Sequence, residues 1–412
     1  MERHPNKLEK FLEEKAKRIQ QNIICIDSHI DIDVNNFTSH TNYTQRLESQ
    51  VNLPKMEDGG LDTAWLIVYT GQDTLTTESY AKASENAISK FDAIQRLCED
   101  YAPNKVGLAL TSADVRRIHA AGKKVIMIGV ENAYPAGEDL SKFEQYHKRG
   151  ARYVGLSHNG HNQFCDSHTG EKDDIWLHDG LSNLGISAVN EMNRLGLMID
   201  TSHLSKESMM QIVALSKAPI IASHSSARAL CNHSRNLDDE QLRLLKENGG
   251  VAQAVAFGSY LNTEKAETRA TYMKSKYQNI ANSLGVTWYD RSNVSSLNKA
   301  LQKEFTENYP KIIRLANEQA AKDPNAPEAV GVPDLVDHID YMVKLIGIDH
   351  VGISSDFDGG GGIQGWSDAS ETFNVTLELV RRGYSEEEIA KLWGENLLRV
   401  LDDVQGYSAA IN

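Results

Sequence analysis

Short apolar runs recur along this sequence, and each is followed by a polar cluster and then by a segment with helical periodicity. A continuous apolar run of this length is typical of a strand that is buried on both faces, as in a parallel sheet. Amphipathic patterns such as 84–101, 114–125, 182–196 and 239–249 lie between the runs. This alternation predicts an α/β fold. Eight runs predict a (β/α)8 TIM barrel, and they cover residues 23–27, 63–71, 125–130, 152–157, 196–200, 218–223, 249–257 and 350–355.

The remaining segments fit a single barrel domain that covers residues 1–412, because such barrels accommodate long insertions. The polar stretch from about 261 to 349 predicts a helical insertion between the last two strands, and it includes a helix over 332–347. A short apolar piece at 106–110 is interpreted as an extra element before the helix at 114. At the C-terminus, Ser385 precedes Glu388 with the spacing of a helix capping box.

Charge and composition exclude several classes of partner. The net charge of −14 argues against nucleic acid or an anionic membrane as the main partner. No run approaches the ~20 apolar residues of a membrane span. The four cysteines are scattered and predict neither a disulfide scaffold nor a thiolate zinc site. Residues 1–22 resemble an amphipathic helix rather than a signal peptide. We therefore expect a soluble protein, either cytoplasmic or exported with a leader missing from this chain.

Six of the eight runs are followed by a histidine or an acidic residue. In a barrel the carboxyl ends of the strands form one rim, so side chains that are distant in sequence would meet there. The residues concerned are His29, Asp31, Glu131, His158, His203, His224 and Asp356.

These side-chain types are those that bind zinc or a similar divalent ion. Six of them, all except His158, exceed what one tetrahedral zinc needs, whereas two metals bridged by a carboxylate and a hydroxide would use them all. His29 and Asp31 are two positions apart on an extended strand, so their side chains leave the same face. Asp27 and Asp33 share this parity, and the pattern alone excludes neither.

Each residue also has a purely structural interpretation. Ser202 and Ser225 could cap helices, and Asp356 and Asp358 could form turns. The glycine run 359–362 lacks the pattern of a phosphate-binding loop and is interpreted as a flexible turn at the mouth of the pocket. All structural interpretations would have to hold together at corresponding strand ends, so a metal site is the better explanation.

With these residues identified, the sequence resembles the membrane (renal) dipeptidase family, peptidase family M19. The matching segments run in family order along nearly the whole chain, and the resemblance implies a TIM barrel, two zinc ions, hydrolysis of dipeptides and a homodimer. The segments are D-S-H-I-D (27–31), G-V-E (129–131), L-S-H (156–158), I-D-T-S-H (199–203), S-H-S-S-A-R (223–228), S-R-N (234–236), S-D-F-D-G (355–359) and G-E-N-L-L-R-V (394–400).

The resemblance also implies roles for the metal ligands. His29 and Asp31 would hold one zinc, and His203 and His224 would hold the second. Glu131 would bridge the two ions.

The resemblance further assigns the groups that act on the substrate. Asp356 would lie beside the first zinc and act as the acid and base, and His158 would contact the oxygen of the scissile carbonyl. Arg235 would bind the C-terminal carboxylate of the substrate, for which a planar guanidinium is well suited. Tyr260 is a further candidate for contact with the substrate.

The expected reaction is amide hydrolysis by a hydroxide that bridges the zinc pair, on L–L dipeptides and, if the pocket is permissive, on L–D dipeptides. Manganese or cobalt could occupy the same ligands. The sequence departs from the family at Ile30 and in the loop 360–370, which leaves side-chain specificity open. The alternatives are another binuclear amidohydrolase-type reaction (a deacylase, lactonase or phosphotriesterase) and a non-catalytic metal-binding protein. Arg235 counts against the first, and the complete ligand set counts against the second.

Overall fold

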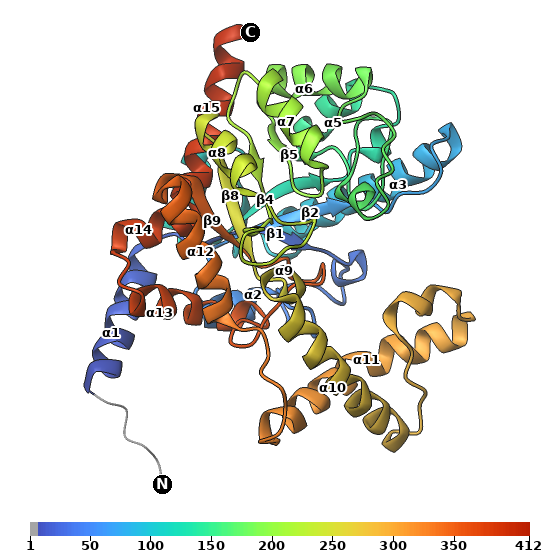
Figure 1. Ribbon diagram of the computed structural model, residues 1–412, viewed down its shortest axis with the longest axis vertical. Coiled ribbons are helices and arrows are strands. Elements are labelled where there is room, and N and C mark those ends of the chain that lie inside the picture. Colours follow the sequence, from blue (N-terminus) through green and yellow to red (C-terminus); the bar gives the residue numbers. More distant parts are fainter. Residues whose placement is uncertain (1–6) are drawn as a thin grey trace. The chain divides into compact units, whose positions relative to one another are not determined.

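The computed structural model describes residues 7–412, and within this range nine strands form one sheet (Figure 1). Eight of them follow one another around the barrel in the order β1-β2-β4-β5-β6-β7-β8-β9, and β3 pairs with β4 outside this path. Each of the paired strands is parallel to its neighbour. The strands are β1 Ile26–Asp31, β2 Thr63–Tyr69, β3 Val106–Leu108, β4 Lys124–Glu131, β5 Ala151–Gly155, β6 Met198–Asp200, β7 Ile221–Ala222, β8 Val251–Val255 and β9 Val351–Ser354.

Helices follow most strands, as the alternating pattern predicts. They are α1 Lys7–Asn22, α2 Leu53–Gly59, α3 Thr77–Arg96, α4 Ser112–Ala120, α5 Ser141–Lys148, α6 Asn183–Leu195, α7 Lys206–Leu215, α8 Asp239–Glu247, α9 Gly258–Leu261, α10 Thr263–Ser283, α11 Lys299–Lys322, α12 Val332–Ile346, α13 Phe373–Arg381, α14 Glu386–Ala390 and α15 Asn396–Ile411. The capping box of Ser385 and Glu388 is present at the start of α14.

The barrel closes between its first and last strands. Ile30 in β1 forms a parallel bridge with Phe357, which follows β9, and the Asp31 N–H donates to the Phe357 carbonyl at 2.8 Å. Nearby, the Asp27 carboxylate accepts a hydrogen bond from the Ser355 N–H at 3.0 Å. The predicted (β/α)8 TIM barrel is confirmed, including the short extra strand before α4.

Apolar side chains fill the barrel near the amino ends of the strands. Ile26, Val125, Met198 and Val251 lie at or near the starts of their strands and are buried in one cluster with residues of α15. Burying such side chains is the main favourable term in folding, at about 25 cal/mol per Å² of apolar surface. The core therefore supports the barrel from this end and leaves the opposite rim to polar side chains.

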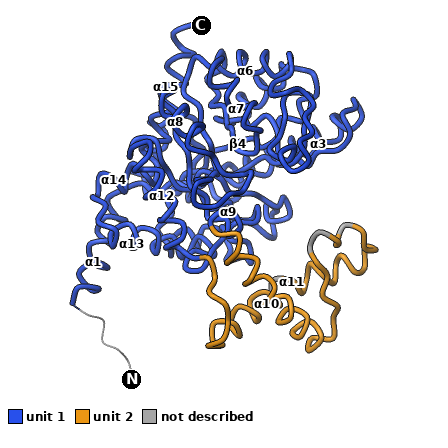
Figure 2. Tube along the Cα trace, viewed as in Figure 1, with its two compact units in different colours: residues 1–261, 331–412 blue, residues 262–330 orange. Residues whose placement is uncertain are grey.

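Two boundaries differ from the sequence-based expectation. The first strand spans 26–31 rather than 23–27, so His29 and Asp31 lie within the strand and not after it. The helical insertion forms a compact unit over 262–330 rather than 261–349 (Figure 2), because α12 has a buried apolar face and packs on β8 and β9 in the barrel unit. That residues 1–412 behave as a single domain stays a prediction.

The insertion unit has an apolar core of its own. Helices α10 and α11 bury Met273, Ile280, Ile312 and Ala316 against each other. The ring of Trp288 lies 4.8 Å from that of Tyr277 at one end of this core.

Candidate metal centre and substrate site

The rim formed by the carboxyl ends of the strands brings the predicted ligands together. His29 and Asp31 come from β1, and Glu131 is the last residue of β4. His203, His224 and Asp356 follow β6, β7 and β9 by two or three residues. Together with His158, which follows β5, they form three overlapping groups, and the ligand atoms within each group lie within 4.8 Å of one another: His29–Glu131–His224, Glu131–His158–His203 and His29–Asp31–Asp356.

Glu131 lies between two sets of imidazoles. Its Oε1 is 3.0 Å from His203 Nε2 and 3.4 Å from His224 Nε2, whereas its Oε2 is 3.6 Å from His29 Nε2. His158 Nε2 also lies 3.9 Å from Oε1. The two oxygens of one buried carboxylate thus face different histidines, which is the arrangement expected of a ligand shared between two cations.

The remaining carboxylates adjoin His29. Asp31 Oδ2 is 3.7 Å and Asp356 Oδ1 is 3.9 Å from His29 Nε2. Gly359 permits this approach, because a Cβ at that position would lie 2.4 Å from both Asp31 Oδ2 and Asp356 Oδ1. The sequence predicted only a flexible turn for the glycine run 359–362. In the structure, Gly359 also leaves space for the carboxylates of Asp31 and Asp356.

Two of these residues have a left-handed backbone conformation. His203 and Asp356 have positive φ values of 69° and 56°. This left-handed conformation costs a non-glycine residue about 1–3 kcal/mol, and it is concentrated at functional sites.

The electrostatics of the centre favour bound cations. Burial raises the pKa of Asp31 to about 7, and the Glu131 carboxylate adds to this effect. Burial opposes a charge on His29, yet the carboxylates of Glu131 and Asp31 raise the pKa of its imidazole to about 9. Burial lowers the pKa values of His203 and His224 well below the usual range and thus disfavours the charged form of both imidazoles. Without a metal, protons must compensate the clustered carboxylates, and divalent cations would displace those protons.

Hydrogen bonds orient two of the imidazoles. The Tyr153 hydroxyl donates to the Ser28 carbonyl at 2.9 Å, so its oxygen can accept from His29 Nδ1 at 2.9 Å. His29 Nε2 then faces the carboxylates; it is buried without a hydrogen-bond partner among the described residues. Ser223 Oγ likewise donates to Asp200 at 2.6 Å and accepts from His224 Nδ1 at 2.7 Å. Such partners hold an imidazole in the tautomer that a metal requires.

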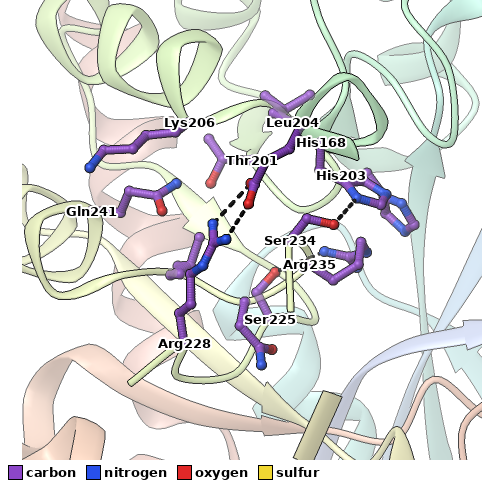
Figure 3. A pocket seen from close by; sticks show the side chains of 13 residues that line it. His168, Thr201, His203, Leu204, Lys206, Ser225, Arg228, Ser234, Arg235 and Gln241 are labelled. Carbon is purple, nitrogen blue, oxygen red and sulfur yellow. Dashed lines mark hydrogen bonds and ion pairs between the residues drawn. The ribbon is translucent and has the colours of Figure 1, made fainter. Parts of the chain in front are cut away.

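Beside this centre lies a buried guanidinium. Arg235 is 2% exposed, and its Nη atoms donate to the His224 carbonyl at 3.0 Å and to Ser225 Oγ at 3.3 Å. Its Nε is buried and has no hydrogen-bond partner among residues 7–412. The guanidinium lies over the Tyr260 ring, 5.3 Å from its centroid. Figure 3 shows Arg235 and Ser225 lining a pocket with His203.

Other residues considered from the sequence have structural roles. Asp27 is buried and accepts from backbone N–H groups of Ser355 and His29. Asp33 accepts from the Asn35 N–H and caps a short helical turn. Ser202 accepts from the His224 N–H. Asp358 accepts from the Gln50 N–H and thereby fixes the loop after β9.

Comparison with known proteins identifies the family. The family model described as membrane dipeptidase (peptidase family M19) matches residues 13–412. The chain belongs to this family. It is 30% identical over 375 residues to the dipeptidase aclJ of Aspergillus oryzae, covering 90% of this chain and 72% of that protein. It is also 30% identical to the dipeptidase tcpJ of Claviceps purpurea, covering 89% of this chain and 72% of that protein.

Solved structures share the fold of this chain. The probable dipeptidase PvdM from Pseudomonas aeruginosa superposes with a TM-score of 0.78 at 34% identity, over 98% of this chain and 100% of the other. An M19 metallopeptidase described as dipeptidase AC superposes with a TM-score of 0.70 at 23% identity, over 93% and 99% of the two chains. This M19 protein is therefore a dipeptidase and a metallopeptidase. Among the described residues, no helix has the length and apolar character needed to cross a membrane.

Sequence reasoning missed the residues that orient the M19 ligands. Asp200 and Ser223 lie inside the matched segments 199–203 and 223–228 but received no role there. Tyr153 lies in an apolar run and looked like a core residue. A usable signal was Gly129, which precedes Glu131 by two residues. A Cβ at that position would lie 2.3 Å from the Tyr153 ring, so the glycine marks where that ring crosses β4.

Tyr153→Phe is expected to weaken metal binding about 10- to 100-fold, the usual effect of losing a partner that orients a ligand. The substitution removes the hydroxyl that accepts from His29 and leaves the ring that packs against β4. Competition with a metal chelator measures the change. Tyr146→Phe is the matched control, because the buried Tyr146 hydroxyl has no hydrogen-bond partner among the described residues. Equal metal affinity in both variants would contradict the role of Tyr153.

Proposed function

We propose that this chain is a zinc-dependent dipeptidase that holds two zinc ions and hydrolyses dipeptides with a free C-terminal carboxylate. The observation that carries the proposal is the position of Glu131, whose two oxygens face His203 and His224 on one side and His29 on the other. A mixed set of imidazoles and carboxylates at this spacing fits zinc better than magnesium or calcium, which prefer oxygen ligands.

In this proposal His29 and Asp31 hold one ion, His203 and His224 hold the other, and Glu131 is shared. The fit of the site to such ions rests on the buried, unpartnered His29 Nε2 and on the clustered carboxylates, Asp356 included. Zinc ions held by these residues would supply a hydroxide nucleophile at neutral pH, because they would lower the pKa of a water toward about 7, and they would polarise the scissile carbonyl.

Two residues of the chain would act directly on the reacting groups. His158 Nε2 lies 3.9 Å from Glu131 Oε1 at the edge of the centre, where it can donate to the developing oxyanion of the scissile carbonyl. Asp356 is 7% exposed and adjoins His29 and Asp31. It would accept the proton released on attack and deliver it to the leaving amine, as a general base and then a general acid.

Arg235 would bind the C-terminal carboxylate. Its unpartnered buried Nε supports this role, because a buried charged donor without a partner is costly unless a ligand supplies one. Tyr260 packs on Arg235 and would close that side of the carboxylate site. A contact between Arg235 and the carboxylate does not distinguish the L from the D configuration at the adjacent Cα. We therefore propose that both L–L and L–D dipeptides are accepted.

The homodimer implied by the resemblance stays a prediction, as does the compartment. Among the alternatives, a lactonase or phosphotriesterase would not need the buried guanidinium of Arg235, because their substrates present no free carboxylate to it. A substrate panel separates these reactions from dipeptide hydrolysis.

The test combines metal analysis with that panel on one purified sample. We expect about two zinc ions per chain by mass spectrometry, together with cleavage of L–L and L–D dipeptides. A tripeptide and an amidated dipeptide should be poor substrates, because they do not present the carboxylate at the same place. Metal without any dipeptide cleavage would move the function to another amide or ester. Absence of metal, and of activity after zinc is restored, would refute the metal centre itself.

A further inference from the structure

A lysine approaches the metal centre from the side of β2. Lys90 lies on α3, and its Nζ lies over the ring of Tyr69, 5.4 Å from the ring centroid. Tyr69 is the last residue of β2 and the register partner of Glu131 in β4. Its ring is also 4.7 Å from the ring of His158. The Tyr69 ring is therefore adjacent both to this ammonium and to the ring of His158.

Among the described residues, the ammonium of Lys90 forms no ion pair. Within residues 7–412, no carboxylate oxygen lies within 4.0 Å of its Nζ, and no hydrogen bond satisfies it. The residue is partly buried. Burial lowers its pKa, and the negative charges of Asp31 and Glu131 oppose that effect. Removing an ammonium from water without pairing it is unfavourable, so the position suits a group that gains an anion when substrate arrives.

The barrel strand that precedes Lys90 and the one that precedes Arg235 lie on opposite sides of the barrel. In the strand order β1-β2-β4-β5-β6-β7-β8-β9, the strand that carries Tyr69 is second and the strand that precedes Arg235 is sixth. These two strands are four places apart in a ring of eight, so they face each other across the barrel, with Glu131 between them on the rim. A dipeptide held by its C-terminal carboxylate at Arg235 extends across the metal centre and places its first residue toward Tyr69 and Lys90.

We propose that Lys90 binds an acidic side chain on the first residue of the dipeptide, so that the preferred substrates carry Glu or Asp at that position. The inference rests on the proposed role of Arg235, because that contact sets the direction in which the substrate lies. Tyr69 forms the floor of this side-chain site and holds the ammonium over its ring, as aromatic faces do for cations. A neutral side chain of the same length would leave the ammonium unpaired.

The test compares Glu-Ala with Gln-Ala, and Ala-Glu with Ala-Gln, as substrates of the zinc-loaded protein. We expect kcat/KM to be about tenfold higher for Glu-Ala than for Gln-Ala, the size of a charge-assisted hydrogen bond at a partly exposed site. No such preference is expected for the second residue. Lys90→Met should abolish the preference by lowering only the Glu-Ala value, and Lys90→Arg should retain most of it.

Lys82→Met is the matched control, because Lys82 is an exposed lysine on the same helix. It should keep the wild-type preference, and all variants should bind the same amount of zinc. Equal cleavage of Glu-Ala and Gln-Ala by the wild-type protein would overturn the inference and leave the dipeptidase function intact. An equal loss on every substrate in Lys90→Met would also overturn it, since Lys90 would then act through the metal centre. Failure to cleave any of the four dipeptides would overturn both proposals.

Discussion

Glu131→Gln is expected to reduce dipeptide hydrolysis at least about 10³-fold and to lower the zinc content below two ions per chain. In the proposed centre this side chain is shared by both metal sites, since Oε1 faces His203 and His224 and Oε2 faces His29. An amide retains the shape but offers one weaker ligand oxygen and no charge. Metal-assisted catalysis contributes several kcal/mol of transition-state stabilisation, and about 4 kcal/mol corresponds to a factor of 10³ in rate.

Steady-state rates and metal analysis on the same sample measure this effect. Glu138→Gln is the control, because Glu138 is exposed on the loop after β4 and undergoes the same chemical change. It should retain both metal and activity. If Glu131→Gln kept two zinc ions and at least a tenth of the wild-type rate, Glu131 would not be the shared ligand.

Arg235→Met is expected to lower kcat/KM for free dipeptides by a factor between roughly 30 and several thousand. Truncating one partner of a buried, hydrogen-bonded charge pair costs about 2–5 kcal/mol, and each 1.4 kcal/mol is a factor of about ten. Arg235 is 2% exposed, and methionine fills much of its volume without the charge. The amidated dipeptide, which lacks the carboxylate, should change less than about threefold, so that the wild-type preference for the free acid disappears.

The comparison of free and amidated substrates separates recognition from a general loss of structure. Arg243→Met removes the same charge from the exposed face of α8 and should leave both substrates unaffected. If Arg235→Met lowered kcat/KM equally for the free and the amidated dipeptide, Arg235 would support the fold of the site rather than bind the carboxylate. Unchanged discrimination between them would exclude its proposed role.

The barrel could be predicted from the sequence because its signals are local. Each parallel strand is buried on both faces and therefore appears as an apolar run such as 125–130. The convergence of His29, Glu131 and His224 followed from the fold rule that all strands of a parallel barrel end at one rim. The boundaries were less certain, because an amphipathic helix such as α12 looks the same whether it belongs to an insertion or to the barrel wall.

The side chains that support the site were not predictable by this route, because their partners are distant in sequence. Tyr153 orients His29 from a strand that is more than a hundred residues away. Gly359 looks like any loop glycine until Asp31 is placed beside it. Lys90 lies on an ordinary polar helix in the sequence, and only the tertiary structure places its ammonium over the ring of Tyr69.

The sequence by itself determined the order of strands and helices, the set of acidic and imidazole side chains proposed as ligands, and the family. These features depend on residue type and on spacing along the chain. The spacing of buried residues follows the periodicity of a helix or a strand, so it indicates the local structure directly. Only the tertiary structure decided that the two oxygens of Glu131 face different histidines, and that the ammonium of Lys90 lies over the ring of Tyr69. The physical reason is that hydrogen bonds, ligand contacts and charge pairs act over a few ångströms in space, whatever the separation along the chain.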